Sequence, residues 1–257
     1  MRRASAPKRL SSLLAVLVLA GCAIAPPTLR APIEPEAQRV VDRLTARWQE
    51  FRDLRALADV DVKKGSERHR VSGVILARAP VSVRFEALSP FGQPFLFFAV
   101  HEGRITAYNA ASNEATVGPA TAETAAEVLS LPVEPEDLVA LLSGRVAPPK
   151  DLRVAELQAP DANGPSIVLV GRYNRQRVWL DLETAVVRQV TITGGRTEAT
   201  VVFKRAGDGA LTGFDVSAGN DYVTAAVRYR SRAENVGVEP ERFALTPPKD
   251  AKIRTIR

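Results

Sequence analysis

The sequence predicts a mainly β (α+β) fold, in which one strongly curved antiparallel sheet forms an incomplete barrel. An N-terminal helix and a short helical insert are expected to cover it. After residue 58, apolar residues alternate with polar ones in most segments, which is typical of strands that bury one face. Helical spacing occurs only over about 36–57 and within 121–147. Because a sheet that buries one face must be covered, these two regions are its predicted cover.

Residues 1–21 have the pattern of an export signal. A basic start is followed by an apolar run over 13–19 and then by small residues, which is the order of a secretory signal. A retained membrane span is the alternative, but the run is shorter than the roughly 20 residues that cross a bilayer. The basic residues are Arg2, Arg3, Lys8 and Arg9.

The signal ends on the only cysteine of the chain, in the stretch Leu19, Ala20, Gly21 and Cys22. This stretch resembles the lipobox of bacterial lipoproteins. The resemblance implies cleavage before Cys22, a diacylglyceryl group on its sulfur and usually an acyl group on the new amine. The alternative is a cut after Ala25, which would leave Pro26 behind the cut, a poor arrangement because its ring fixes φ and removes the N–H. Two or three acyl chains anchor a protein stably in a membrane.

Composition narrows the function classes for the mature chain, residues 22–257. Four of the cations behind the net charge of +6 lie in the signal, so the mature chain carries about +2. No basic run is interleaved with aromatic residues, which argues against a nucleic-acid partner. With Cys22 acylated no thiol remains, so the fold depends on its hydrophobic core and not on disulfides. We expect a monomer without a cofactor, apart from the covalent acyl groups.

A proline-rich tether, residues 22–35, is predicted to join the lipid to the folded domain. Pro35 suits the first position of a helix, and Glu36 suits the positive end of the helix dipole. The helix expected over about 36–57 is amphipathic. Its apolar positions are Val40, Val41, Leu44, Trp48, Phe51 and Leu54.

Alternation and glycine-containing turns predict about ten strands and a possible eleventh. They lie near 58–64, 69–78, 81–88, 94–101, 104–109, 166–172, 177–182, 186–193, 198–205 and 211–217, with the eleventh at 222–230.

The helical insert begins after Thr121, which can cap a helix, and it is broken by Pro132 and Pro135. A second short helix is expected to end at Gly144. The folded domain is expected to span 36–248.

A basic tail follows at 249–257. We expect it to be solvated and frayed, and the alternative is that it leans on anionic head groups.

Three stretches resemble LolB, the outer-membrane lipoprotein receptor, whose relative LolA is the periplasmic carrier. They are Leu88–Gln93 with its Pro-apolar-Gly turn, the strand Phe95–Val100, and the leucine-rich helix Leu138–Gly144. The resemblance covers roughly 36–230 and is most specific over about 88–147. It implies a half-barrel whose apolar interior holds the acyl chains of another lipoprotein, with acylated lipoproteins and a periplasmic carrier as partners.

The resemblance also implies site residues. In LolB a protruding loop carries an exposed apolar residue that helps deliver cargo into the membrane, and this position falls on Phe91. The alternative is an ordinary buried turn aromatic. Ala23, after the lipidated cysteine, implies transfer to the outer membrane, facing the periplasm. The candidate cavity lining consists of Trp48, Phe51, Phe85, Phe95, Phe97 and Leu141. Interlocked aromatic side chains would instead make a solid core.

No catalytic or metal-binding pattern is present, so we predict no enzyme. The two histidines, His69 and His101, do not form a His-Glu-x-x-His pattern, and no nucleophile elbow or phosphate-binding glycine loop occurs. The leading hypothesis is an outer-membrane lipoprotein that binds acyl chains in lipoprotein localisation. The alternative is a structural or assembly lipoprotein that uses the same fold to hold a protein partner of an envelope complex.

Overall fold

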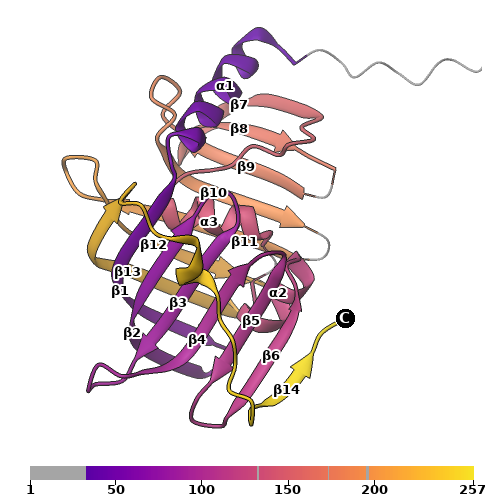
Figure 1. The fold of residues 1–257 in the computed structure, drawn as a ribbon. Helices are drawn as coiled ribbons and strands as arrows, with labels where there is room; N and C mark the ends of the chain where they lie inside the picture. Colours follow the sequence, from indigo (N-terminus) through magenta and orange to yellow (C-terminus); the bar gives the residue numbers. More distant parts are fainter. Residues whose placement is uncertain (1–32, 132, 173, 195–196) are drawn as a thin grey trace, which may run out of the picture. The chain divides into compact units, whose positions relative to one another are not determined.

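The computed structural model describes residues 33–257 except 132, 173, 195 and 196 (Figure 1). The predicted signal, the lipobox with Cys22, and most of the tether therefore lie outside the described residues. The main element is one 14-stranded sheet with β7 at one edge and β14 at the other. No pairing among the described residues joins the two edges, so the sheet is an incomplete barrel and the predicted fold class is confirmed.

The elements follow one another along the chain with mostly short turns. They are α1 (Pro35–Gln49), β1 (Asp53–Lys64), β2 (Glu67–Arg78), β3 (Ser82–Leu88), β4 (Pro94–His101), β5 (Arg104–Asn109), β6 (Glu114–Pro119), α2 (Ala122–Leu129), α3 (Pro135–Ser143), β7 (Val154–Asp161), β8 (Gly164–Val170), β9 (Asn174–Leu180), β10 (Val187–Gly194), β11 (Thr197–Arg205), β12 (Leu211–Ala218), β13 (Val223–Glu234), the 3-10 helix η1 (Pro240–Phe243) and β14 (Lys252–Thr255).

The sheet has two faces, and the three α-helices of the described residues pack on only one of them, the inner face. Because side chains alternate along a strand, β1 buries Leu54, Ala56 and Ala58 on the inner face and presents Asp59 and Asp61 on the outer face. Helix α1 packs against β7, whereas α2 and α3 pack against strands between β2 and β6 (Figure 1). The predicted cover is therefore confirmed, and one continuous hydrophobic cluster joins helices and sheet.

Helix α1 ends at Gln49, so the predicted end near residue 57 is wrong. The apolar spacing continues through Phe51 and Leu54, but long-range contacts turn the chain into β1. Asn235 accepts a hydrogen bond from the Arg52 N–H at 2.8 Å and donates to the Glu50 carbonyl at 3.0 Å. Asp53 accepts from the N–H of Val236 at 2.9 Å. A segment 183 residues away in the sequence thus competes with the local helix pattern.

The sequence pattern did not predict three of the strands: β6, β7 and β14. The last of these corrects the prediction of a frayed tail, because residues 252–255 pair in parallel with β6. The segment 235–250 before it crosses the outer face over β3 and β4 (Figure 1). Phe243 anchors the segment, being fully buried and stacked on His101 with 6.2 Å between ring centroids.

Candidate functional site

The inner face beneath α3 is the place where the sequence predicts a cavity, and α3 occupies it. Val139, Leu141 and Leu142 are buried on this helix. They belong to the same hydrophobic cluster as Ile75 of β2 and Phe98 of β4. The helix is short, and it is delimited by Pro135 at its first position and Gly144 at its end, with φ of 73°. Helix α3 therefore fills the concave side of the sheet.

A crevice of about 160 Å³ lies between Leu141, Val146 and the β10 residues Val190 and Ile192, and it is too narrow to admit water. This crevice cannot hold an acyl chain. An acyl chain on the inner face would have to take the place of side chains that are packed there now.

Four of the six predicted lining residues lie on the helix side of the sheet or beside it. Phe85 and Leu141 contact the hydrophobic cluster beneath α3. Trp48, at the end of α1, stacks on the buried Phe51 with 5.8 Å between ring centroids. Phe85 and Leu141 thus contribute to one extended hydrophobic cluster, and the Trp48–Phe51 pair lies at the junction of α1 and β1.

The prediction is wrong for Phe95 and Phe97. Phe85 pairs with Phe98 across the β3–β4 ladder, so alternation puts Phe97 on the opposite, outer face. There Phe97 stacks on Tyr108 at 5.9 Å. Phe95, two residues earlier in β4, shares the outer face with Phe97.

The N-terminal end of α3 docks through a buried acid, Asp137. Its carboxylate accepts hydrogen bonds from the side-chain amides of Gln176 at 2.9 Å and Asn174 at 3.3 Å. Burial raises the pKa of Asp137 to about 7, and the nearby carboxylates of Glu134 and Glu136 add to the shift. The Gln176 side chain is buried too, and its Oε1 has no hydrogen-bond partner in the described part of the chain. This end of α3 is therefore held by polar groups within an apolar interior.

The C-terminal end of α3 is also held by polar side chains. Its last carbonyls accept hydrogen bonds from three side chains of the sheet: Leu142 from the Tyr229 hydroxyl, Ser143 from Arg232, and Gly144 from Arg205. Because these are the unsatisfied carbonyls at the negative end of a helix dipole, cationic donors stabilise them.

Arg145 adds a further set of polar contacts at this end of α3. It makes a two-pronged ion pair with Glu234, with N–O distances of 2.7 and 3.1 Å, and it lies 5.3 Å from the centroid of the Phe51 ring. Glu234 also pairs with Arg232. The two arginines lower the pKa of Glu234 against the opposing effect of burial. Glu234 thus remains ionised between two guanidinium groups.

The turn between β3 and β4 carries the predicted membrane-insertion residue, Phe91. Its side chain is 92% exposed, so the buried-aromatic alternative is excluded. The turn is closed by hydrogen bonds from the Gly92 N–H to the Ser89 carbonyl at 2.9 Å and from the Ser89 N–H to the Gln93 carbonyl at 2.8 Å. Gly92 has φ of 78°, a conformation that glycine adopts without strain. Pro90 and Gly92 therefore present an apolar ring on a tight turn.

A second exposed apolar residue, Leu96, lies close to this turn. It is 37% exposed and pairs with Ala87, which places it on the inner face of β4. Exposed apolar surface thus occurs both at the tip of the β3–β4 hairpin and on the adjacent part of the inner face.

Metal-binding clusters and membrane-spanning helices are both absent from the described part of the chain. No group of three or more His, Cys, Asp and Glu side chains there could hold a metal ion. No described helix is long and apolar enough to cross a membrane.

The sequence pattern did not predict the polar contacts that hold the two ends of α3. Acids in the first turn of a helix, such as Glu136 and Asp137, are stabilised by the helix dipole wherever they point, and only the fold turns Asp137 inward. One signal was present. Asp137 lies three residues before Ala140 and four before Leu141, so it shares a helix face with apolar residues.

Several solved structures are similar to this one over most of their length. An outer membrane lipoprotein-sorting protein domain from Vibrio parahaemolyticus is 13% identical over 80% of this chain and 97% of that domain, with a TM-score of 0.53. The LolA superfamily protein NE2245 from Nitrosomonas europaea is 9% identical over 81% and 97%, with a TM-score of 0.55. A DUF1329 family protein from Desulfovibrio piger is 12% identical over 83% and 97%, with a TM-score of 0.59.

The chain has the LolA/LolB-like fold that its sequence resembles. No protein-family model matches the sequence, and no curated protein sequence matches it. At identities of 9–13% the likeness concerns the fold.

Proposed function

We propose that the mature protein is held in the outer membrane by acyl groups on Cys22, faces the periplasm, and binds acyl chains of lipoproteins or lipids on its inner face. The role that fits this binding is lipoprotein localisation, with acylated lipoproteins and a periplasmic carrier as partners. The function is binding, and no residue is assigned a catalytic role.

The exposed ring of Phe91 is the observation that carries this proposal. Burying a phenylalanine side chain in an apolar environment contributes about 2–3 kcal/mol, which the protein forgoes while the ring faces water. A bilayer or an acyl chain would supply that environment. Leu96 extends the exposed apolar surface from the hairpin tip toward the inner face. The LolA-like fold and the lipobox-like ending support the same interpretation.

Acyl-chain binding on the inner face requires α3 to move. The contacts at both ends of α3 suit a displaceable helix, because Asp137 and the carbonyls of Leu142 and Ser143 can exchange protein partners for water. The apolar surface of Ile75, Phe85 and Phe98 that α3 leaves would then be covered by the acyl chain. In this proposal the acyl chain takes the place that α3 now occupies on the inner face.

The proposal can be tested with the mature chain carrying Cys22→Ala. A diacylated peptide is added, and native mass spectrometry measures the fraction of protein that retains it. Flotation with phospholipid vesicles measures membrane binding of the same sample. We expect a one-to-one complex, and we expect Phe91→Ser to reduce vesicle binding about tenfold through the lost ring. Val236→Ser, which replaces another exposed apolar side chain, is the matched control and should change neither result.

A protein partner is the second candidate function, and the packed inner face favours it. A crevice that excludes water is typical of a structural core, and an assembly lipoprotein would need no cavity. A well-folded protein that captures no diacylated peptide, with vesicle binding that is insensitive to Phe91→Ser, would contradict acyl-chain binding. That result would favour a structural or assembly role in an envelope complex.

A further inference from the structure

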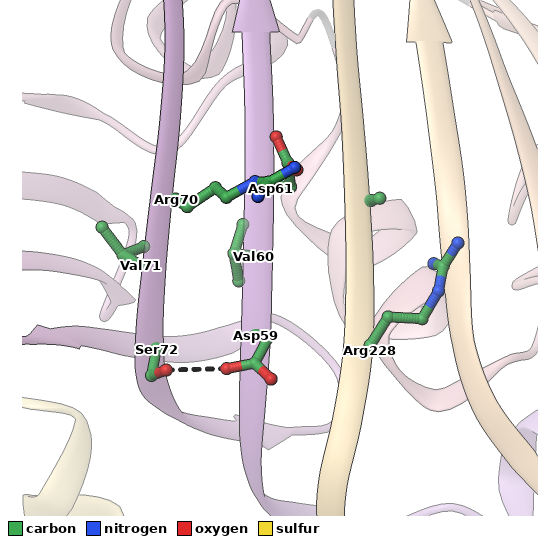
Figure 2. A pocket seen from close by; sticks show the side chains of 8 residues that line it. Asp59, Val60, Asp61, Arg70, Val71, Ser72 and Arg228 are labelled. Atoms are coloured by element: carbon green, nitrogen blue, oxygen red, sulfur yellow. Dashed lines mark hydrogen bonds and ion pairs between the residues drawn. The ribbon is translucent and has the colours of Figure 1, made fainter.

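The outer face carries a charged groove that acyl-chain binding does not use. Two adjacent hollows, of about 410 and 450 Å³, share Asp61 and Ala226 and run across the strands from β2 through β1 and β13 to β11. We call them together the outer groove. Figure 2 shows the first hollow, in which Ser72 on β2 donates a hydrogen bond to Asp59 on β1 at 2.6 Å.

The pairing register forms the groove. Asp61 pairs with Arg70 on one side and with Ala226 on the other, so a small residue lies beside long charged ones on the same face. Thr224 and Ser217, which pair with each other on β13 and β12, continue the run of short side chains. The short side chains make the floor of the groove, and the long charged side chains stand along it.

Positive charge exceeds negative charge in this groove. Asp61 is shared by Arg68 and Arg70, with shortest N–O distances of 2.5 and 2.7 Å. Asp59 pairs with Arg230 at 2.7 Å, and Asp215 pairs with both Arg228 and Lys204. Four cations line the groove beside the three carboxylates: Lys63, Arg68, Arg70 and Arg228. Arg230 and Lys204 reach the same carboxylates from outside the lining.

The three carboxylates hold the cations in place. Hydrogen bonds from the arginines lower the pKa of Asp59, Asp61 and Asp215, so all three stay ionised at neutral pH. Exposed ion pairs of this kind contribute little to folding stability, about 0–1 kcal/mol each. Their clearer physical effect is to fix the direction of half-exposed guanidinium groups. Arg70, for example, reaches Asp61 through Nε and is 69% exposed.

We infer that the outer groove docks an acidic, extended segment of a partner protein. Carboxylates of such a segment would pair with Arg70 and Arg230, whose guanidinium groups offer further donors in a planar fork. The partner's own cations or backbone N–H groups would meet Asp61 and Asp215. A mixed arrangement of this kind favours a matched partner and repels a uniformly anionic one.

A flat anionic bilayer is the less suitable occupant. Its head groups would lie against the three carboxylates of the groove as well as against the cations. None of the large apolar side chains exposed in the described part of the chain lines the groove, so nothing there would enter the acyl layer. The exposed apolar ring of Phe91 lies instead at the β3–β4 turn.

The test uses a fluorescein-labelled peptide in which glutamates outnumber lysines two to one, with serines between them, added to the mature chain with Cys22→Ala. Fluorescence anisotropy measures its dissociation constant at low and high salt. We expect binding that weakens with salt, and a loss of about tenfold in the double variant Arg70→Gln/Arg230→Gln at low salt. Arg39→Gln, which removes an exposed arginine from α1, is the matched control and should have little effect. Thermal unfolding confirms that each variant is folded.

Three outcomes would overturn the inference. They are no peptide binding, equal losses in the groove variant and in Arg39→Gln, or binding to phosphatidylglycerol vesicles that depends on Arg70 and Arg230 while the peptide does not bind. Because acyl-chain capture is measured with a different ligand and depends on the inner face, either proposal can fail without the other.

Discussion

Two segments cover opposite faces of the same sheet, and they are attached by different physical means. Helix α3 covers the inner face and is tied at both ends by polar groups, Asp137 at its start and the Arg145–Glu234 pair at its end. The segment 235–250 covers the outer face and is anchored by Phe243, whose side chain is fully buried. Polar groups can exchange their protein partners for water, whereas a phenylalanine ring gains no equivalent partner there. Helix α3 also buries Val139, Leu141 and Leu142, whereas Phe243 is the only side chain that the segment 235–250 buries. Under the proposed function an acyl chain replaces the apolar contacts of α3 when the helix leaves, whereas the segment 235–250 stays attached through Phe243.

The largest loss of stability should come from a change in the segment 235–250, which covers the outer face. Phe243→Ala removes a fully buried ring and should lower the free energy of unfolding by about 4 kcal/mol, measured by chemical denaturation. Val236→Ala, in the same segment but 53% exposed, should change it by less than about 0.5 kcal/mol. Equal effects of the two substitutions would show that Phe243 is not the anchor.

The next effect concerns the pH dependence of stability. Asp137 has its pKa raised from 3.8 to about 7 in the folded state, so the folded protein binds the proton more tightly than the unfolded chain does. The free energy of unfolding should therefore fall with rising pH between about 4 and 7, by about 2–3 kcal/mol from pH 5 to pH 8. Asp137→Asn should flatten this profile and raise stability at pH 8. A profile that Asp137→Asn leaves unchanged would contradict the assignment.

A smaller loss of stability is expected from a change at the C-terminal end of α3. Glu234→Ala leaves Arg145 and Arg232 without their shared carboxylate and should lower the free energy of unfolding by about 2 kcal/mol. Hydrogen exchange should accelerate in α3 more than in β3, because Glu234 holds the arginines that clamp the end of this helix. Equal acceleration in both elements would argue against a locally displaceable helix.

The smallest of the four effects tests how closely the inner face is packed. A Cβ atom on Gly73 would lie 2.4 Å from the Phe85 ring and 2.7 Å from the Glu86 carbonyl oxygen. Gly73→Ala should therefore destabilise the protein by about 1–2 kcal/mol. The added change Phe85→Leu should recover only part of this stability, because the clash with the backbone remains. An unchanged melting temperature in Gly73→Ala would mean that Phe85 does not pack on β2 as described.

The sequence predicted the central strands of the sheet better than its edges. Central strands such as β1 and β13 alternate apolar and polar residues, so most of their length and their faces follow from the pattern, although β1 begins at Asp53 and β13 ends at Glu234, beyond the predicted bounds. The edge strands β7 and β14 do not alternate in this way. β7 contains Pro160, and β14 has two cations in four residues, as is typical of edges that avoid pairing with other chains.

The site shows the same limit. The turn that carries Phe91 could be predicted from Pro90 and Gly92, but the sequence left open whether the ring is exposed or buried. The faces of Phe95 and Phe97 could not be chosen, since β4 is apolar at nearly every position and both faces of the strand are covered. The cover on the second face is the segment around Phe243, which is far away in the sequence. Asp137 likewise acquires its buried partners only from β9.

Acyl-chain binding on the inner face is best tested by mapping where an acyl chain lies. A diacylated peptide with a photoreactive diazirine in one chain is incubated with the mature chain carrying Cys22→Ala, irradiated, and the labelled residues are identified by mass spectrometry. We predict labels on the inner face, at Phe85, Phe98 and Leu141. Labels confined to the outer face at Phe97 and Tyr108, or no labels on a folded protein, would contradict binding beneath α3.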